Sequence, residues 1–255
     1  MSKKKLHKRS VTEKDTFGLP YDILSDILIK VPVKSLLRFK SISKPWNAII
    51  SGDEFIKAHR DQSKALGRRK LLLQSKYTGE FELMDLENPK VVTVTQDQES
   101  PLKNSHVLCS LDGLVLLDIN MLDETFALWN PSTRQHQTLR CPYLINSTRA
   151  RACGLCYDCT VHDYKVILIY ILFYVVYSTN TDFWTMKTMF PIFEVLELYY
   201  GSRGINRGIS TEGRVYWSLD WELLNQGVRK VSTIIYFDVK LDELKELPTE
   251  ADPGF

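Results

Sequence analysis

Residues 126–130, Phe-Ala-Leu-Trp-Asn, are the stretch that most directly indicates the fold, because their pattern recurs along the chain. In each copy a mostly apolar strand ends in Asp, Asn or Ser, a short polar turn follows, and a second strand begins. The other copies are residues 81–85 (FELMD), 174–178 (YVVYS) and 234–238 (IIYFD). Together with the β-branched and aromatic runs between them, these copies predict an all-β region from residue 70 onward.

The spacing of the copies indicates a repeated sheet. Their closing residues, Asp85, Asn130, Ser178 and Asp238, are separated by 45, 48 and 60 positions. Most intervals hold a further strand pair around a turn, as at Asp112-Gly113 and Glu212-Gly213. A four-stranded unit repeated every ~40–50 residues is typical of a β-propeller blade. We predict a kelch/propeller-like domain of about four units, apparently incomplete; a meandering β-sandwich is the alternative, because any all-β protein alternates strands and turns.

The N-terminal part follows a helical pattern instead. Apolar residues recur there at helical spacing and predict one apolar stripe: Ile23, Leu24, Ile27, Leu28 and Val31. Pro32 should end this helix, because proline lacks the N–H that continues it. We predict three further short helices, one holding Leu36, one capped by Ser43, and one after Asp53. So small a module rarely supplies a sufficient core, so we expect it to lean on a partner or on the next domain.

Composition and charge exclude several classes of protein. The 255 residues are 44% apolar and 25% charged, as in ordinary folded proteins of one or two domains. Residues 1–18 hold six Lys/Arg against two acids, and the remainder holds 27 basic against 29 acidic residues. This near-neutral body argues against nucleic acid as a partner. The longest apolar run, Val166 to Tyr177, has 12 residues, fewer than the ~18 that cross a bilayer.

The start of the chain is basic but no apolar segment follows it, so no secretion signal is predicted. We expect no membrane association and a cytoplasmic or nuclear location. The five cysteines are then expected to be reduced thiols.

The helical module resembles an F-box. The resemblance rests on residues 19–40 (LPYDILSDILIKVPVKSLLRFK), on Ser43-Lys44-Pro45-Trp46 and on Phe55, which stand in the order and spacing of that family. It implies binding to the Skp-type linker of a cullin-RING (SCF) ubiquitin ligase, and through the linker to cullin. The residues expected at the linker are Leu19, Pro20, Ile23, Leu24, Ile27, Leu28, Val31, Pro32, Leu36 and Leu37.

These ten residues carry more apolar surface than three short helices can hide, which supports an interface. The alternative is that they form the core of the module. We expect a division, with Trp46, Ile49 and Phe55 mostly in the core and Leu19, Pro20 and the apolar stripe mostly at the interface.

The remaining chain resembles the F-box-associated, kelch-like region of the large plant F-box family. Its matching stretches are residues 109–115 (CSLDGLV), 128–134 (LWNPSTR), 154–158 (GLCYD) and 163–166 (DYKV). The resemblance implies a non-catalytic adaptor, without a cofactor, whose β domain holds a protein substrate while other subunits transfer ubiquitin. The expected domains are a basic disordered tail (1–18), the F-box (19–63), a linker (64–69) and the kelch-like β domain (70–255).

Two departures from the family pattern leave alternatives open. The connection between residues 166–172 and 173–178 is nearly absent, so that hairpin is either tight or shifted in register. The chain also stops at Phe255, soon after the fourth unit, where the family's region usually continues. The protein could therefore be a truncated paralogue that binds the linker, but no substrate, and competes with complete adaptors. A free-standing ligand-binding β protein is the third possibility.

Catalytic and metal sites are not predicted. Motifs for phosphate binding, dinucleotide binding, zinc proteolysis and serine hydrolysis are missing from the sequence. The acidic pairs Asp123-Glu124 and Glu243-Glu246 are expected to be solvated. Cys153, Cys156 and Cys159 have the spacing of metal ligands, but residues three apart on a strand point to opposite faces, so buried thiols are the preferred interpretation.

Aromatic residues of the β region are expected mainly in the core between repeats rather than at a ligand site: Trp129, Tyr157, Tyr164, Trp184, Tyr216, Trp217 and Trp221. Substrate contact is assigned instead to a long polar loop predicted over residues 222–231. The residues chosen there are Trp221, Glu222 and Arg229, because loops commonly carry specificity.

Overall fold

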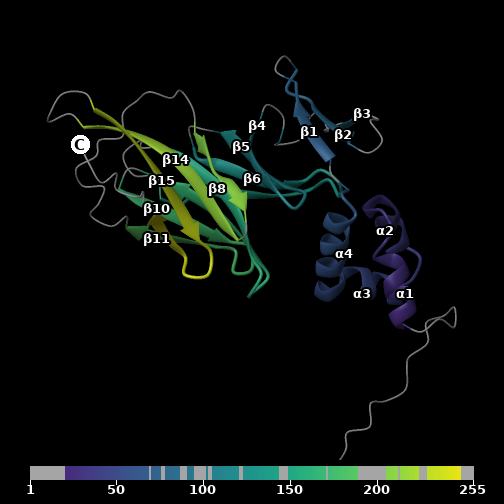
Figure 1. Ribbon diagram of the computed structural model, residues 1–255. Helices are drawn as coiled ribbons and strands as arrows, with labels where there is room; N and C mark the ends of the chain where they lie inside the picture. The colour runs from purple at the N-terminus through teal and green to yellow at the C-terminus, as the bar shows by residue number, and fades with distance from the viewer. Residues whose placement is uncertain are drawn as a thin grey trace, which may run out of the picture. The chain divides into compact units, whose positions relative to one another are not determined.

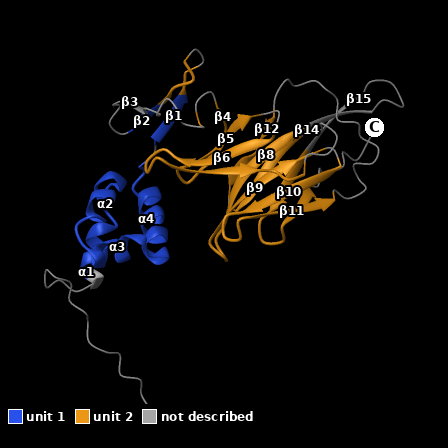
Figure 2. Cartoon of the chain, turned by 180° about the vertical axis from the view of Figure 1, so that it is seen from behind, with its two compact units in different colours: residues 1–73, 82–93 blue, residues 74–81, 94–255 orange. Residues whose placement is uncertain are grey.

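Helices come first and strands follow in the structure of the protein, a computed structural model (Figure 1). It describes residues 21–68, 70–75, 78–86, 91–94, 102, 105–120, 123–143, 149–170, 172–188, 205–211, 213–223 and 229–247. Two compact units divide the chain (Figure 2): residues 1–73 with 82–93, and residues 74–81 with 94–255. The first strands therefore group with the helices.

The helical part has four helices: α1 (Tyr21–Leu28), α2 (Val33–Phe39), α3 (Lys44–Ser51) and α4 (Asp53–Ala65). Ser43 caps α3 as predicted, because its hydroxyl accepts a 3.3 Å hydrogen bond from the Trp46 N–H. Helix α1 ends at Leu28, earlier than predicted, and Pro32 is instead the N-cap residue of α2. None of the described helices is long and apolar enough to span a bilayer.

The strands form four sheets, and neighbouring strands in a sheet are mostly consecutive in the chain. The first sheet contains β1 (Lys70–Gln74), β2 (Phe81–Asp85) and β3 (Val91–Val94); the second contains β4 (His106–Leu111), β5 (Leu114–Asn120), β6 (Thr125–Asn130) and β7 (Gln135–Arg140). The third contains β8 (Ala152–Asp158), β9 (Asp163–Ile169), β10 (Phe173–Ser178), β11 (Phe183–Thr188) and β12 (Asn206–Arg207), and the fourth β13 (Ile209–Thr211), β14 (Arg214–Leu223), β15 (Arg229–Asp238) and β16 (Glu243–Glu246). This arrangement confirms small helices followed by repeated, propeller-like sheets.

In two copies of the repeat, those closed by Asn130 and Asp238, the closing polar residue shapes the turn after it. Asn130 and Asp238 accept hydrogen bonds through Oδ1 from the backbone N–H two residues on, at 3.0 and 3.1 Å. The fifth residue of each turn has a positive φ, 62° at Arg134 and 54° at Asp242. A side chain that caps its own turn and a left-handed residue before the next strand are common hairpin devices. At Asn130 and Asp238 the recurring polar residue therefore has a local structural cause.

Two hairpins predicted from the sequence are present. Asp112 and Gly113 connect β4 to β5 with φ angles of 53° and 85°, the positive values that a two-residue hairpin turn requires. The hairpin between β9 and β10 is tight: the Tyr170 N–H donates to the Phe173 carbonyl at 2.9 Å, and Ile169 pairs with Tyr174.

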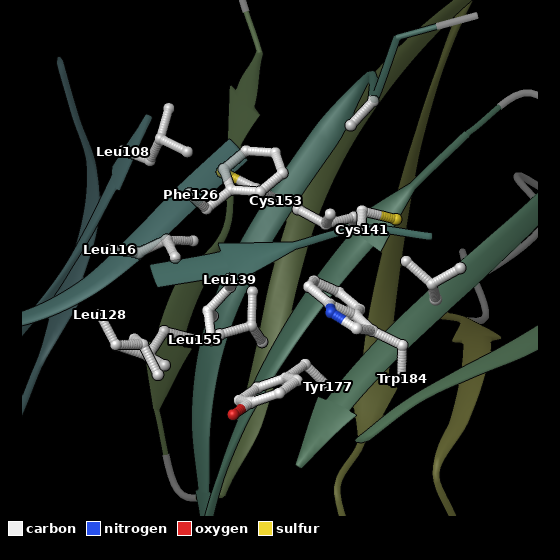
Figure 3. Packing of buried hydrophobic residues seen from close by; sticks show 14 of the residues in the cluster. Leu108, Leu116, Phe126, Leu128, Leu139, Cys141, Cys153, Leu155, Tyr177 and Trp184 are labelled. Carbon is white, nitrogen blue, oxygen red and sulfur yellow. The ribbon is translucent and has the colours of Figure 1, made fainter. Parts of the chain in front are cut away.

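The second and third sheets each have a forward face, toward the next sheet in the chain, and the third and fourth each have a back face, toward the preceding sheet. Alternate residues of a strand serve the two faces. The forward face of the second sheet and the back face of the third form one core (Figure 3), which includes Leu116, Phe126, Leu155 and Tyr177. The forward face of the third and the back face of the fourth form another, which includes Ile167, Val176, Trp217 and Phe237. Trp129, Trp184 and Trp217 are buried, as predicted, whereas Tyr157, Tyr164 and Tyr216 are only half-buried.

Trp217 is the central residue where the third and fourth sheets meet. Its Nε1–H donates to the Cys153 carbonyl at 2.9 Å, and its ring lies against Gly154 and Gly208. A Cβ atom built on Gly154 would lie 2.6 Å from Trp217 Cζ2, and one on Gly208 would lie 2.7 Å from Trp217 Nε1. The two glycines therefore make the space into which the indole fits.

Candidate functional site

The exposed row of helix α1 is the first candidate surface. Ile23 and Ile27 are one helical turn apart and are 49% and 52% exposed. Leu24 and Leu28, each the next residue along, are buried in the core of the helical part. One residue rotates the side chain direction by about 100° on a helix, so the two pairs point to different sides. The predicted apolar stripe is therefore two rows, of which one is exposed.

The structure divides the ten residues assigned to the linker. Leu24, Leu28 and Leu36 are in the core with Ile49, Ile50 and Phe55, where Val31 packs as a half-buried residue. Ile23, Ile27, Pro32 and Leu37 are exposed, and Leu19 and Pro20 lie outside the described residues. Trp46 is half-buried and packs edge-on against Phe39, with ring centroids 5.4 Å apart. A partner can therefore reach fewer residues of the stripe than the sequence indicates.

Sequence reasoning missed three residues that bear on this surface. Ile42, between α2 and α3, is 53% exposed, and its signal was an isolated apolar residue between two serines. His59 Nε2 lies 2.9 Å from the Val31 carbonyl oxygen, and the Arg68 guanidinium donates to the Lys30 carbonyl at 2.8 Å. Both side chains thus form hydrogen bonds with backbone carbonyls just after α1. In this way α4 and the residues after it fix the segment that connects α1 to α2.

The second candidate surface is the ribbon made by the ends of β14 and β15. These strands have ten residues each, whereas β13 pairs only with residues 214–216 and β16 only with residues 235–238. The pairs Trp221 with Val231, Glu222 with Lys230 and Leu223 with Arg229 thus extend past the neighbouring strands. Residues 222–223 and 229–231 of the loop predicted over residues 222–231 are strand instead, because β pairing continues outward. The rest of the predicted loop, and the side chains of Trp221, Glu222 and Arg229, lie outside what the structure describes.

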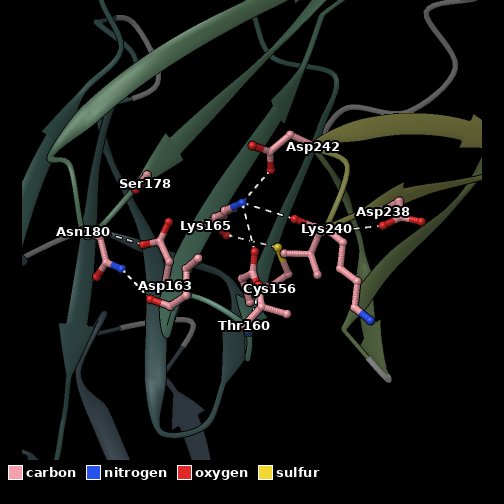
Figure 4. A network of polar contacts seen from close by, with 12 residues as sticks. Cys156, Thr160, Asp163, Lys165, Ser178, Asn180, Asp238, Lys240 and Asp242 are labelled. Atoms are coloured by element: carbon pink, nitrogen blue, oxygen red, sulfur yellow. Dashed lines mark hydrogen bonds and ion pairs between the residues drawn. The ribbon is translucent and has the colours of Figure 1, made fainter.

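A polar network lies where the third and fourth sheets meet at their turns (Figure 4). Lys165 Nζ is 2.7 Å from Asp242 Oδ1 and 3.4 Å from Asp158 Oδ2, and donates to the Val239 carbonyl at 3.2 Å. The Asp242 carbonyl also accepts hydrogen bonds from Tyr174 Oη and Lys187 Nζ, at 3.0 and 2.7 Å. The third sheet therefore holds the β15–β16 turn of the fourth at several points.

The charges of this network shift two pKa values. Burial alone would raise the pKa of Asp158, but hydrogen bonds from Thr160 and the Lys165 ammonium lower it below its ordinary value. Burial alone would lower the pKa of Lys165, but Asp242 and Asp158 raise it overall. Both groups are therefore held charged. Since Lys165 is only 7% exposed and Asp158 only 4%, the network is suited to joining the sheets and offers little to a ligand.

Glu124 corrects one sequence expectation. It was predicted to be solvated with Asp123, yet it is 2% exposed. Its Oε1 accepts a 3.0 Å hydrogen bond from the Ala150 N–H, and its Oε2 accepts one from the Tyr170 hydroxyl. Burial raises the pKa of Glu124, although these hydrogen bonds oppose the shift. The carboxyl is buried because partners distant in the sequence surround it.

The three closely spaced cysteines do not converge. Cys153 packs in the core between the second and third sheets, Cys156 in the core between the third and fourth, and Cys159 is exposed in the turn after β8. This confirms that residues three apart on the strand face opposite ways. In the part of the chain that the structure describes, no three metal-ligating side chains gather.

Comparison with known proteins identifies two domain models. Residues 17–58 match the F-box domain, and residues 77–252, more than half of the chain, match the F-box associated beta propeller domain. The four helices and the repeated sheets described above lie mainly within these two ranges.

Curated proteins of Arabidopsis thaliana are similar to the chain. F-box/kelch-repeat protein At3g23880 is 29% identical over 254 residues, covering 91% of this chain and 65% of that protein. F-box protein ETP2 is 24% identical over 215 residues, covering 78% and 54%, and F-box protein CPR1 is 33% identical over 158 residues, covering 58% and 37%. The chain thus spans 65% or less of the length of each of these relatives.

Proposed function

Because the chain belongs to the family of F-box proteins with an F-box associated beta propeller domain, we propose that it is a substrate-recognition adaptor of an SCF (cullin-RING) ubiquitin ligase. The F-box binds a Skp-type linker protein and, through it, cullin. The β sheets hold a protein substrate, and other subunits transfer ubiquitin to it. The adaptor itself performs no catalysis.

The exposed row of Ile23 and Ile27 is the observation that supports linker binding most directly. Two branched apolar side chains, each about half exposed on a short helix, would be better placed in an interface. Leu37 on α2, which is 37% exposed, is a further exposed apolar residue among those predicted at the linker. Full burial of such a side chain contributes about 1.5–3 kcal/mol. A few of them therefore offset the cost of association and leave a useful affinity.

We expect the double variant Ile23→Asp with Ile27→Asp to weaken binding of the full chain to a Skp-type linker protein by about 100-fold. The reason is that each aspartate would be desolvated in the interface without a partner. Both positions are exposed, so the helical part should still fold, which circular dichroism checks. Isothermal titration calorimetry measures the affinity.

Ile56→Asp is the matched control, because Ile56 on α4 is 53% exposed and lies outside the predicted linker residues. This variant should bind like the wild type. Equal binding by the double variant and the wild type would contradict the interface, and no binding by the wild type would contradict the adaptor function.

We propose that substrate contacts the ribbon of β14 and β15, which extends past its neighbouring strands. A projecting ribbon presents residues from both strands to a partner without disturbing the sheet behind it. The double variant Trp221→Ala with Arg229→Ala is expected to reduce capture of substrate by at least about tenfold, because aromatic and arginine side chains commonly dominate interfaces. Linker affinity should be unchanged.

Quantitative crosslinking and mass spectrometry of the linker-bound complexes measures this capture. Lys240→Ala serves as the control, because Lys240 is exposed in the β15–β16 turn at the other end of β15. If Trp221 and Arg229 can be removed with the set of captured proteins unchanged, the ribbon is not the substrate surface.

A further inference from the structure

Asp118 is a buried carboxylate on the forward face of the second sheet. It lies on β5 two residues after Leu116 and pairs with Phe126 of β6, and both of those side chains are in the core between the second and third sheets (Figure 3). Asp118 is only 2% exposed. Within the described residues, no group donates a hydrogen bond to either of its carboxylate oxygens. A buried polar group without a partner is rare in folded proteins, so this one requires an explanation.

A second buried acid, Glu124, acts on Asp118 through its negative charge. The two carboxyl groups differ in their partners. Glu124 accepts hydrogen bonds from the Ala150 N–H and the Tyr170 hydroxyl, whereas Asp118 accepts none from the described residues. Hydrogen bonds to a carboxylate favour its charged form. A negative charge is therefore better tolerated on Glu124, and Asp118 is the group that takes up a proton more readily.

Charged groups on three elements act on Asp118 in opposite directions. Burial is the largest cause that raises the pKa of Asp118, and the charge of Glu124, just before β6, adds to it. His106, which pairs with Asp118 from β4, and Arg149, shortly before β8, lower this pKa. Both of these groups are exposed, so solvent screens their charges. The balance leaves the pKa of Asp118 above its ordinary value.

We propose that Asp118 is a proton-binding site in the junction between the second and third sheets, and that uptake of its proton strengthens this junction as the solution becomes acidic. The proton removes the repulsion between two buried carboxylates. It also removes the cost of holding an unpaired charge beside apolar side chains. The proposal is independent of linker binding, because all of these residues belong to the β-sheet unit.

The direction of the pH dependence follows from the raised pKa. The folded protein holds this proton more tightly than the unfolded chain does, so the stabilising contribution is fully present below the ordinary aspartate pKa of about 4. It is lost as the pH rises from there through the raised pKa of the folded protein. The window of Asp118 therefore lies above pH ~4, between the ordinary aspartate pKa and the raised one.

Asp118→Asn tests the proposal on the full chain, because an amide resembles a carboxyl group that keeps its proton at every pH. Urea unfolding followed by circular dichroism is measured from pH 5 to pH 8. At pH 8 we expect the ratio of folded to unfolded protein to be at least about tenfold higher for this variant than for the wild type. The advantage should shrink steadily as the pH falls toward 5.

Two further variants complete the experiment. Glu246→Gln is the matched control, because Glu246 is exposed on β16 and its replacement removes one negative charge elsewhere in the same unit. It should follow the wild type at every pH. Asp118→Leu removes the polar atoms as well as the charge, so it tests the same carboxylate without a buried amide that needs partners of its own. We expect it also to exceed the wild type at pH 8.

Two results would overturn the proposal. The first is that neither Asp118→Asn nor Asp118→Leu is more stable than the wild type at pH 8, which would mean that the carboxylate is charged there without penalty. The second is an advantage of the same size at pH 5 and pH 8, which would mean that the gain does not come from removing a charge.

Discussion

Replacing Trp217 by alanine is expected to lower the free energy of unfolding of the β-sheet unit by about 4 kcal/mol. The indole is 1% exposed and joins the third and fourth sheets. Its removal loses apolar burial, leaves a cavity and unpairs the Cys153 carbonyl, and buried tryptophan truncations cost about 3–5 kcal/mol. Urea unfolding followed by circular dichroism measures the change.

Gly154→Ala tests the same junction from the opposite side. The added Cβ would meet Trp217 Cζ2 at 2.6 Å and would also press on Val215. Overpacking of this kind costs about 1–3 kcal/mol, so we expect about 2–3 kcal/mol here because the ring is enclosed. Gly208→Ala should behave similarly, since its Cβ would meet the same two side chains.

The double variant Gly154→Ala with Trp217→Ala supplies the control. Without the indole the alanine has space, so adding Gly154→Ala to Trp217→Ala should cost less than about 1 kcal/mol. Equal costs of Gly154→Ala in both backgrounds would show that the glycine is needed for some reason other than room for Trp217.

Lys165→Met is expected to destabilise the β-sheet unit by about 3 kcal/mol at neutral pH. Removing one partner of a buried ion pair leaves the other charge unpaired, at a cost of about 3–5 kcal/mol. The lower value applies because Asp242, 38% exposed at its side chain, can be solvated, whereas Asp158 cannot. Lys240→Met is the matched control, since Lys240 is exposed in the adjoining turn.

The pH dependence of stability provides a second measurement on this network. The pKa of Asp158 is lowered in the folded protein, so its stabilising contribution is present above the ordinary aspartate pKa of about 4 and is lost as the pH falls below that. The pKa of Lys165 is raised, so its contribution is present below about 10.5 and is lost as the pH rises further.

Lys165→Met should flatten both ends of this profile relative to Lys240→Met. Urea midpoints measured from pH 3 to pH 11 give the comparison. If the two variants had the same profile, the network would not contribute through its charges.

Local signals in the sequence located the elements well. The closing residues Asn130 and Asp238 are turn caps, and the spacing of the repeat marked the third strand of the second, third and fourth sheets. The dipeptide Asp112-Gly113 predicted a turn, and both residues have the positive φ angles of a two-residue hairpin turn. Ser43 predicted the start of α3, because a capping serine and a proline in the first turn are local signals that do not depend on distant residues.

Signals that depend on distant partners were harder to interpret. Glu124 appears in the sequence as half of an exposed acidic pair, but Ala150 and Tyr170 bury it. Lys165 belongs to a stretch that matched the family pattern but was given no structural role, although it joins two sheets through Asp242, 77 residues later. Glu222 and Arg229 were placed in a loop, because local polarity concealed the long register between β14 and β15.

By itself the sequence determined the helical and strand-rich parts, the repeat, the turn positions and the alternation of each strand between two faces. The tertiary structure alone decided which face is covered: that Leu24 and Leu28 face inward while Ile23 and Ile27 do not, and that Trp217 fits between Gly154 and Gly208. The physical reason is that periodicity depends on backbone geometry within a few residues, whereas coverage depends on which distant segments pack there.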